Sequence, residues 1–291
     1  MGLVRKAKRK PDGKVFAVKF LAPDPKYIEQ ESFDDVALRF KREGERGARL
    51  THPSLVKIFA FDDNQDGALF RGSGPGNPVL LMEYCSGKTL ESYIRRLPAD
   101  EKGVFRVTKE RVSIALQLAK GLEFLHEKKV VHRDVKPANV FLTGHAGPGN
   151  VRLGDFGVVK WGDFHASMST GVLTATNQQG LGTLKYMSPE QAVRPKEVTV
   201  RADLYSLGIT LFELFTGQIL ASPHHVFEIM SARLLRGTTI SRYMSMGYSI
   251  GPTDASIGEL LLDMHLRGPS GRPAIAKVRG RLEWELEQFA S

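Results

Sequence analysis

The segment Val130–Leu142 restricts the fold of this chain more than any other part of the sequence. Its letters, VVHRDVKPANVFL, place charged and amide side chains between two short apolar runs. Polar groups beside buried apolar segments need partners, so these side chains are expected to meet at one site. A further strand-like run, Val151–Leu153, comes just before Asp155. We expect a hairpin between the two runs, closed by the loop Gly144–Asn150.

The polar residues of this region suit phosphate chemistry. We expect Asp134, Lys136, Asn139 and Asp155 to converge when the hairpin forms. Asn139 and Asp155 offer the carboxylate and amide oxygens that Mg²⁺ accepts together with substrate phosphates. Asp134 is a candidate proton acceptor, and Lys136 is a candidate cation for stabilising phosphate charge.

The hydrophobic pattern changes near residue 85 and divides the chain into two parts. The first part indicates strands at 3–8, 14–21, 55–61 and 79–83, with one helix across 32–50. The second part is mainly helical, with apolar residues spaced three or four apart between Val112 and Leu125 and between Ile275 and Phe289. A segment that is apolar on nearly every side, 203–216, predicts a buried helix. The pattern is typical of an α+β chain with a small β-rich part and a larger helical part.

Glu43 is an anomaly in the predicted helix 32–50. Phe33, Val36 and Phe40 form an inward stripe at helical spacing, and Glu43 falls on the same stripe. A buried carboxylate costs several kcal/mol unless it is paired or reaches water. Either the stripe is displaced by one residue and Glu43 is exposed, or Glu43 pairs with a cation. Lys19, at the end of an apolar run, is the candidate partner.

The composition fits a globular protein that needs no oxidising compartment. Hydrophobic residues make up 42% and charged residues 25%, which excludes a wholly disordered chain. The single cysteine, Cys85, can form no internal disulfide and is expected to be inert rather than a reactive thiol. No apolar run approaches the roughly 20 residues of a membrane span, and the start lacks the apolar core of a signal peptide. We therefore expect a soluble, cytoplasmic protein.

The positive charge is concentrated at the start of the chain. The formal net charge is +9, and residues 1–19 contain seven basic residues and one acid, Asp12. One interpretation is an arm that binds nucleic acid or an anionic surface. The other is a solvated hairpin that happens to be basic. We favour the hairpin, because Pro11-Asp12-Gly13 is a turn signal and Val15–Val18 is a strand signal.

Four short motifs together resemble the eukaryotic-type (Hanks-type) serine/threonine protein kinase family, over nearly the whole chain. His132-Arg133-Asp134 with Asn139 resembles the catalytic loop, and Asp155-Phe156-Gly157 resembles the metal-binding motif. Ala17-Val18-Lys19 is similar to the strand that carries the phosphate-contacting lysine, and Ser188-Pro189-Glu190 is similar to the end of the activation segment. Each motif alone is weak. Their order and spacing make the resemblance specific.

The resemblance implies one bilobal kinase domain over residues 1–291. The small β-rich lobe would cover 1–82, the hinge 83–87 and the mainly helical lobe 88–291. Only Gly2-Leu3-Val4 matches the family's phosphate-covering loop, so its first two glycines and the first strand would lie before residue 1. Gly47 departs from the family, where a larger apolar residue often packs, and it is expected to leave a gap beside Ile58.

The resemblance also implies catalytic and ligand-binding roles. Asp134 would orient the attacking hydroxyl and accept its proton, and Lys136 would lie by the γ-phosphate. Lys19 would contact the other phosphates and pair with Glu43. The remaining implied residues brace the loop (Thr183), hold Mg²⁺ (Asn139 and Asp155) or surround ATP (Gly2, Val4, Ala17, Met82, Glu83, Cys85 and Phe141).

Further implied roles are structural or regulatory. Glu190 and Arg272 would form a buried ion pair, and Asp203 would anchor the catalytic loop from the buried helix. Arg133 would be ready to pair with a phosphorylated residue of the activation segment. The candidates for that residue are Ser167, Ser169, Thr170, Thr174 and Thr176.

The implied function is transfer of the γ-phosphate of ATP to serine or threonine hydroxyls of protein substrates, with Mg²⁺ or Mn²⁺ as the metal. Autophosphorylation and a signalling role would accompany it. The stretches Tyr186–Gln191 and Arg201–Gly208 resemble bacterial kinases and also kinases of the translation initiation factor 2 α subunit, and we favour the bacterial type. The alternatives are a catalytically weak pseudokinase or scaffold, a nucleic-acid-binding module using the basic start, and a small-molecule kinase of related fold.

Overall fold

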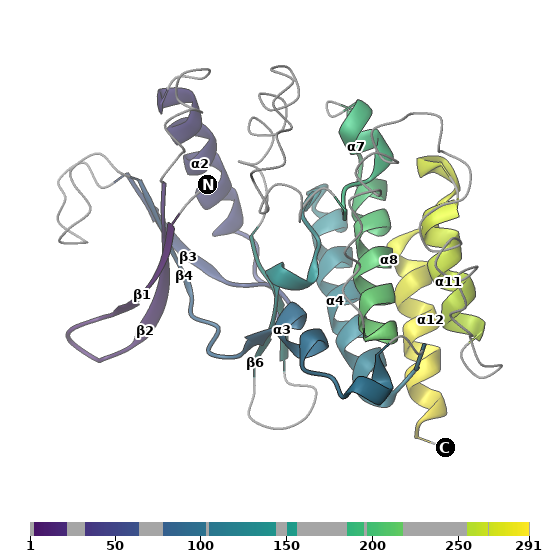
Figure 1. Ribbon diagram of the computed structural model, residues 1–291. Coiled ribbons are helices and arrows are strands. Elements are labelled where there is room, and N and C mark those ends of the chain that lie inside the picture. The colour runs from purple at the N-terminus through teal and green to yellow at the C-terminus, as the bar shows by residue number, and fades with distance from the viewer. Residues whose placement is uncertain are drawn as a thin grey trace. The chain divides into compact units, whose positions relative to one another are not determined.

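The computed structural model describes residues 3–21, 33–63, 78–102, 105–143, 150–155, 185–194, 197–217, 255–266 and 268–290. The chain divides into two compact units. The first comprises Met1–Ser86 and Asp155–Thr174, and the second comprises Gly87–Gly154 and Ala175–Ser291. The first unit is a β-sheet with one long helix, and the second is mainly helical (Figure 1). This confirms the predicted α+β class and the change of pattern near residue 85.

The first unit is built on a four-stranded antiparallel sheet. Its strand order is β1-β2-β4-β3, so the hairpin neighbours β1 and β2 pair directly and β4 lies between β2 and β3. The strands are β1 (Leu3–Lys8), β2 (Val15–Phe20), β3 (Ile58–Asp62) and β4 (Val79–Glu83). All four lie at or close to the ranges that the sequence predicts.

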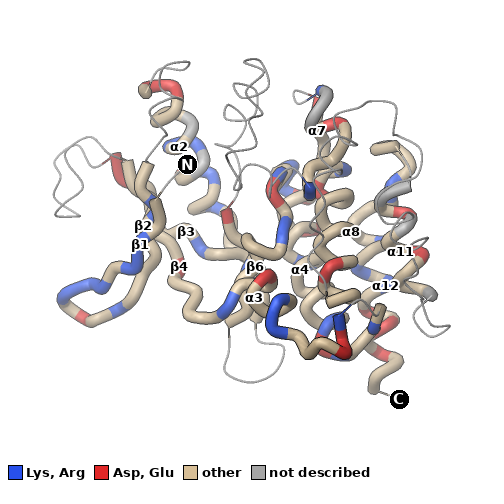
Figure 2. The backbone as a smooth tube through the Cα atoms, in the orientation of Figure 1, with Lys and Arg blue, Asp and Glu red and all other residues tan. Residues whose placement is uncertain are grey.

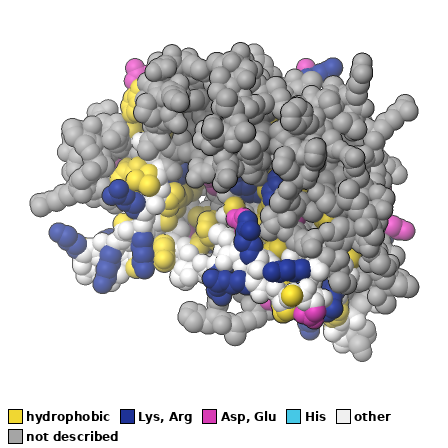
Figure 3. Space-filling model, viewed as in Figure 1, with side chains coloured by type: hydrophobic (Ala, Val, Ile, Leu, Met, Phe, Trp, Pro, Cys, Tyr) yellow, Lys and Arg dark blue, Asp and Glu magenta, His cyan; other side chains and the backbone are white. Residues whose placement is uncertain are grey.

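The β1–β2 hairpin closes as a hydrogen-bonded turn. The main-chain N–H of Arg9 donates to Lys14 O (2.8 Å), and the N–H of Gly13 donates to Arg9 O (2.9 Å). Gly13 has a φ of +68°, a left-handed conformation that glycine adopts without steric cost. Lys and Arg lie along both strands (Figure 2), and their side chains project from the hairpin end in Figure 3. The hairpin that the turn and strand signals predict is confirmed, and its basic side chains from Arg5 to Lys14 are exposed.

Helix α2 (Phe33–Gly47) packs on one face of this sheet. Val36 and Phe40 form a buried cluster with Leu21 and Leu80. Because side chains alternate along a strand, the contact also identifies the two faces of β2. The Nζ of Lys19 lies 5.9 Å from the centroid of the Phe40 ring, so Lys19 is on the α2 face.

Two glycines allow α2 to approach the sheet closely. A Cβ on Gly47 would lie 2.3 Å from Ile58 Cδ1, and a Cβ on Gly44 would lie 2.3 Å from Leu80 Cδ2. The prediction of a gap at Gly47 is therefore wrong. The Ile58 side chain occupies that space, because glycine lets the strand and the helix come together.

The second unit is organised around helix α8 (Arg201–Thr216), which is buried along almost its whole length, as predicted. Helix α4 (Lys109–Glu127) packs against α12 (Ile275–Gln288), and α11 (Ala255–Leu266) packs against α8. A small sheet of β5 (Lys88–Thr89), β6 (Val140–Thr143) and β7 (Asn150–Leu153) carries the predicted hairpin. The shorter helices are α3 (Leu90–Arg95), α7 (Pro189–Val193) and the 3₁₀ turns η1 (Ala99–Glu101), η2 (Pro137–Asn139) and η6 (Pro269–Gly271).

A buried arginine ties the start of α4 to the end of α8. Thr108 caps α4 by accepting a hydrogen bond from the N–H of Arg111. The Arg111 guanidinium donates to Glu101 Oε2 (2.6 Å) and to Phe215 O (3.1 Å). Such a charge is stable in the interior because it is paired and hydrogen-bonded. Within the described ranges, none of the helices combines the length and apolar character that a bilayer span requires.

We expect Gly44→Ala to lower the free energy of unfolding by roughly 1–3 kcal/mol, because its Cβ would collide with Leu80 and lie 2.9 Å from Phe61 Cβ. The matched control is Gly280→Ala in α12, where no atom lies within 4 Å of the added Cβ. There the better helix propensity of alanine should raise stability by up to about 1 kcal/mol. Urea unfolding followed by circular dichroism measures both. Equal stability of the two variants would contradict the close approach of α2 to the sheet.

Candidate active site

Asp134, Lys136 and Asn139 lie together in the loop between α4 and β6. Asp134 Oδ1 is 3.1 Å from the Nζ of Lys136. The Nδ2 of Asn139 donates to Asp134 Oδ2 (2.6 Å) and to the Asp134 main-chain oxygen (2.9 Å). Both oxygens of this nearly buried carboxylate therefore have a fixed partner, which holds the carboxylate in one orientation. The predicted convergence is confirmed for these three residues; Asp155, the fourth residue of that prediction, belongs to the first unit, and its convergence with them stays a prediction.

The 3₁₀ turn η2 positions Asn139. Pro137 begins the turn, where its fixed φ suits a helical start, and the N–H of Asn139 donates to Lys136 O (2.9 Å). The Asn139 main-chain oxygen accepts from Gly154 N (2.9 Å), which joins the turn to the end of β7. Within the described part of the chain, both side-chain hydrogen bonds of Asn139 use Nδ2. The amide oxygen Oδ1 is therefore the atom that this residue can offer to a cation.

The buried carboxylate of Asp203, on α8, anchors the loop that carries Asp134. Asp203 Oδ2 accepts the main-chain N–H of His132 (2.9 Å), and Oδ1 accepts that of Arg133 (2.7 Å). The Nε2 of His126, in the last turn of α4, lies 2.8 Å from Asp203 Oδ2. The anchoring role predicted for Asp203 is confirmed.

Arg133 is held in a strained backbone conformation. Its φ is +69°, in the left-handed region that residues other than glycine rarely adopt. Both main-chain groups are fixed, because its N–H donates to Asp203 and its oxygen accepts from Gln191 Nε2 (3.0 Å). Burial lowers the pKa of its guanidinium, and the negative charge of Asp203 partly offsets this. Such strain persists where the surrounding bonds determine the conformation, and it is concentrated at functional sites.

His132 links the loop to β7 through its ring. Its Nδ1 accepts the main-chain N–H of Asp134 (3.3 Å), so that nitrogen carries no proton. Its Nε2, 3.2 Å from Gly154 O, must then be the protonated nitrogen and the donor. The fully buried ring is thus a neutral structural element that fixes the spacing between the loop and the residues before Asp155.

In the first unit, Lys19 pairs with Asp155. The Nζ of Lys19 lies 2.9 Å from Asp155 Oδ1, and both side chains are largely sheltered. Asp155 has a φ of +60°, a second left-handed residue at a predicted site position. The pairing of Lys19 with Glu43 stays a prediction, because the Glu43 side chain lies outside the described part of the structure.

The strand that ends at the predicted hinge contributes main-chain groups. The N–H of Glu83 donates to Lys57 O (2.8 Å), so the adenine contact predicted for Glu83 can use only its carbonyl oxygen. Ala17 and Met82 are directly paired across β2 and β4. Val4 on β1 is exposed, and Cys85 is half-buried. Phe141 belongs to β6 of the second unit.

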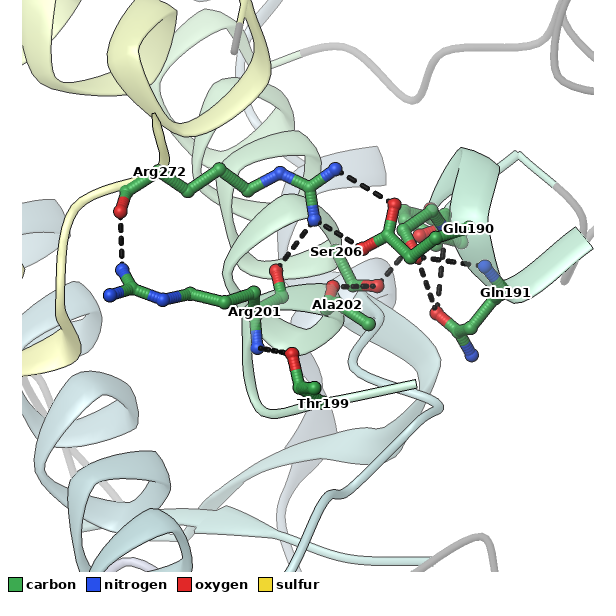
Figure 4. Close-up of polar contacts among 9 residues, drawn as sticks. Glu190, Gln191, Thr199, Arg201, Ala202, Ser206 and Arg272 are labelled. Carbon is green, nitrogen blue, oxygen red and sulfur yellow. Dashed lines mark hydrogen bonds and ion pairs between the residues drawn. The ribbon is translucent and has the colours of Figure 1, made fainter. Parts of the chain in front are cut away.

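An ion pair fixes the short helix α7 to the start of α8 and to η6 (Figure 4). The Arg272 guanidinium donates to Glu190 Oε1 and Oε2 at 2.5 and 2.9 Å, and to Arg201 O at 2.7 Å. This confirms the predicted pair. Ser188 and Gln191 form a capping box at the start of α7, which satisfies two main-chain N–H groups.

Glu213 is a buried charged residue that the sequence pattern did not single out. It is fully buried on α8, and its carboxylate accepts from the hydroxyl of Tyr186 (2.7 Å) and from Lys185 Nζ (3.3 Å). Burial, with the charge of Glu213, raises the pKa of Tyr186 well above its ordinary value, so the hydroxyl stays protonated and donates. The sequence signal that could have identified Glu213 is a single acidic residue near the end of the apolar segment 203–216. His126 and Gln191 were also missed.

Several predicted residues lie outside the described ranges. These are Gly2, Phe156, Gly157, Thr183 and the activation-segment serines and threonines 167–176. Among the residues that are described, no group of three or more His, Cys, Asp or Glu side chains is arranged to hold a metal ion. Asn139 Oδ1, in the second unit, and the Asp155 carboxylate, in the first, are oxygen donors of the kind that Mg²⁺ accepts together with water and phosphate oxygens.

The α+β fold and the geometry of the catalytic loop define the class of this protein as a kinase domain. The family model described as the protein kinase domain matches residues 1–279. The chain belongs to this family, as the motifs predicted.

Curated relatives include bacterial proteins. The chain is 34% identical, over 75% of its length and 27% of the relative, to a probable serine/threonine-protein kinase of Clostridium perfringens. It is 33% identical, over 71% of its length and 28% of the relative, to a probable serine/threonine-protein kinase, PknB, of Corynebacterium glutamicum. It is 35% identical, over 62% of its length and 24% of the relative, to the serine/threonine-protein kinase PrkC of Bacillus subtilis. The chain thus spans about a quarter of the length of these relatives.

We expect Arg272→Met to lower the free energy of unfolding by about 3 kcal/mol, because it leaves the Glu190 carboxylate without its buried partner. The double variant Glu190→Gln/Arg272→Met should lose less than the sum of the single variants. The control is Arg194→Met, whose ion pair with Glu197 is exposed and is expected to contribute at most about 1 kcal/mol. Thermal unfolding measures all of these. Additive losses in the double variant would show that the pair is not coupled.

Proposed function

We propose that this chain transfers the γ-phosphate of ATP to serine or threonine hydroxyls of protein substrates. The observation that carries the proposal is the fixed carboxylate of Asp134, held by Lys136 and Asn139 on a loop that Asp203 anchors. The names of the bacterial relatives support serine and threonine as the acceptors. Phosphoryl transfer requires mainly positioning and charge stabilisation from a protein, and we propose that this loop supplies both.

Asp134 is proposed as the residue that orients the substrate hydroxyl and accepts its proton. Its two oxygens already contact Lys136 and Asn139, so the carboxylate cannot rotate away from the direction that the loop gives it. The Lys136 ammonium, 3.1 Å from Asp134 Oδ1, places a positive charge beside the proposed proton acceptor. We propose that the same ammonium stabilises negative charge on the transferred phosphoryl group.

Lys19, Asn139 and Asp155 are proposed to bind the phosphates and the metal. Lys19 would hold phosphate oxygens, and Asn139 Oδ1 with the Asp155 carboxylate would hold Mg²⁺, for which Mn²⁺ is an alternative. When bound, the metal neutralises phosphate charge and fixes the orientation of the phosphates. Lys19 and Asp155 are paired with each other, so each side chain holds the other in place.

The remaining assignments belong to the same proposal. Val4, Ala17, Met82 and Phe141 would surround the adenine, with the main chain of Glu83 and Cys85 as hydrogen-bonding groups. Gly2 would contact the phosphates, Glu43 would pair with Lys19, and Thr183 would brace the loop. We further propose one catalytic domain over 1–291, autophosphorylation of its activation segment, and a signalling role in the cytoplasm. The pseudokinase alternative has no supporting observation, because Asp134, Asn139 and Asp155 are all present.

We expect Asp134→Asn to reduce phosphorylation of a generic protein substrate by roughly 10²–10⁴-fold, because the proton acceptor is lost while the hydrogen bonds by which Asp203 anchors the loop are kept. Labelled ATP measures the transfer, and mass spectrometry identifies the modified residues as serine or threonine. Asp100→Asn, at an exposed position in η1, is the control and should keep full activity. Equal labelling by wild type and Asp134→Asn would refute the assignment of Asp134.

We expect activity to disappear in EDTA and to return with added Mg²⁺. The variant Asp155→Asn should need more Mg²⁺ for half-maximal activity, because an amide is a weaker cation ligand than a carboxylate. A Mg²⁺ titration of wild type and variant measures the difference, with Asp263→Asn on α11 as an unrelated charge control. Full activity of the wild type in EDTA would show that the reaction needs no metal.

A further inference from the structure

Cations surround two aromatic rings where the β1–β2 hairpin meets the start of β3. Phe16 and Phe59 contact edge to face, with ring centroids 5.5 Å apart and an interplanar angle of 83°. Lys14 Nζ lies 5.7 and 5.9 Å from the two centroids, and Lys57 Nζ lies 5.5 Å from that of Phe59. The Arg9 guanidinium lies 5.6 Å from the centroid of Phe16. We call these five residues the cation–aromatic cluster.

The positive charge of this cluster is only partly neutralised. Asp12, the one acid of the hairpin, accepts a hydrogen bond from Arg9 Nε (2.8 Å), which lowers the pKa of Asp12. In the part of the chain that is described, neither the Lys14 nor the Lys57 ammonium forms an ion pair; Lys57 contacts Glu83 through its main-chain N–H (3.2 Å). Further exposed cations lie along the same hairpin, at Arg5, Lys6, Lys8 and Lys10.

The cluster lies on the face of the sheet opposite to Lys19. Phe16 and Lys19 are three residues apart on β2, so their side chains point to opposite faces. Lys19 lies over Phe40 on the α2 face, and Phe16 packs against Phe59 on the other. A molecule bound at the cluster would therefore leave the Lys19 face unchanged.

Two kinds of polyanion could bind here, and the geometry favours an acidic protein segment over nucleic acid. Nucleobases bind by stacking on a free aromatic face. The Phe59 ring already carries the ammonium groups of Lys14 and Lys57, and Phe16 is buried. Carboxylates can pair with these ammonium groups without displacing them. The exposed part of Phe59, 39% of its surface, would then meet an apolar side chain of the same segment.

We propose that the cation–aromatic cluster is a docking surface for an Asp/Glu-rich segment of a protein partner, and that the partner is a substrate of the phosphotransferase. The role of the partner as a substrate rests on the function proposed above. The binding does not, because it uses no residue assigned to ATP, to the metal or to the reacting hydroxyl. Docking of this kind would raise the local concentration of substrate without altering the transfer step.

The test is fluorescence anisotropy of a short labelled peptide of Glu and Asp residues with one central Leu. We expect salt-sensitive binding that Lys14→Glu/Lys57→Glu weakens at least about tenfold. The matched control is Lys128→Glu/Arg281→Glu, which makes the same charge change at two cations that lie over Phe124 and Trp284. It should stay within about twofold of wild type. If thermal unfolding shows that Lys14→Glu/Lys57→Glu is not folded, Lys14→Gln/Lys57→Gln is tested in its place.

Several outcomes would overturn the docking proposal. These are no peptide binding by wild type, equal weakening by both double variants, tighter binding of a single-stranded RNA, or self-association at the cluster that excludes the peptide. A parallel assay with labelled ATP and a substrate protein lacking acidic runs separates this proposal from the proposed function. Wild type and both variants should label that protein equally. Peptide binding without labelling would refute the phosphotransferase, whereas labelling without peptide binding would refute the docking surface.

Discussion

The buried carboxylate of Asp203 is the interaction on which the candidate site depends. It accepts two successive main-chain N–H groups of the catalytic loop and contacts His126. A carboxylate with no solvent exposure is stable only with such partners, so the core of the second unit and the loop stabilise each other. Helix α8 is buried on all sides, and the position of Asp203 is therefore set by hydrophobic packing. The geometry around Asp134 is a consequence of that packing.

From Asp203 a continuous set of polar contacts extends toward the end of the activation segment. The main-chain N–H of Arg133 donates to Asp203, and its main-chain oxygen accepts from Gln191, whose neighbour Glu190 pairs with Arg272. The left-handed conformation of Arg133 is the local cost of this arrangement. The benefit is that the catalytic loop and helix α7 keep a fixed relation within the second unit. A substitution at any of these contacts should disturb the site without touching the reacting groups.

In the first unit, side chains alternate along β2, so the ion pair of Lys19 and the cations around Phe16 lie on opposite faces of the sheet. Lys19 faces α2 and pairs with Asp155, while Phe16 carries the cations of the opposite face. The close approach of α2 through Gly44 and Gly47 keeps the first face compact, because no side chain holds the helix away from Leu80 and Ile58. On the second face the cations are exposed to solvent, which screens their mutual repulsion and leaves them accessible to an anionic partner.

The sequence by itself determined the order of the elements, the α+β class and the protein kinase family, and it picked out the candidate residues of the loop between α4 and β6. These depend on local periodicity and on short motifs, which a single chain displays directly. It also predicted the partners Glu190 and Arg272, through the resemblance alone. Only the tertiary structure decided that Ile58 fills the space at Gly47, that Glu213 pairs with Tyr186 and Lys185, and that Phe59 lies among cations. Contacts of this kind join residues far apart in the chain, and they depend on how closely two backbones approach, which no local pattern records.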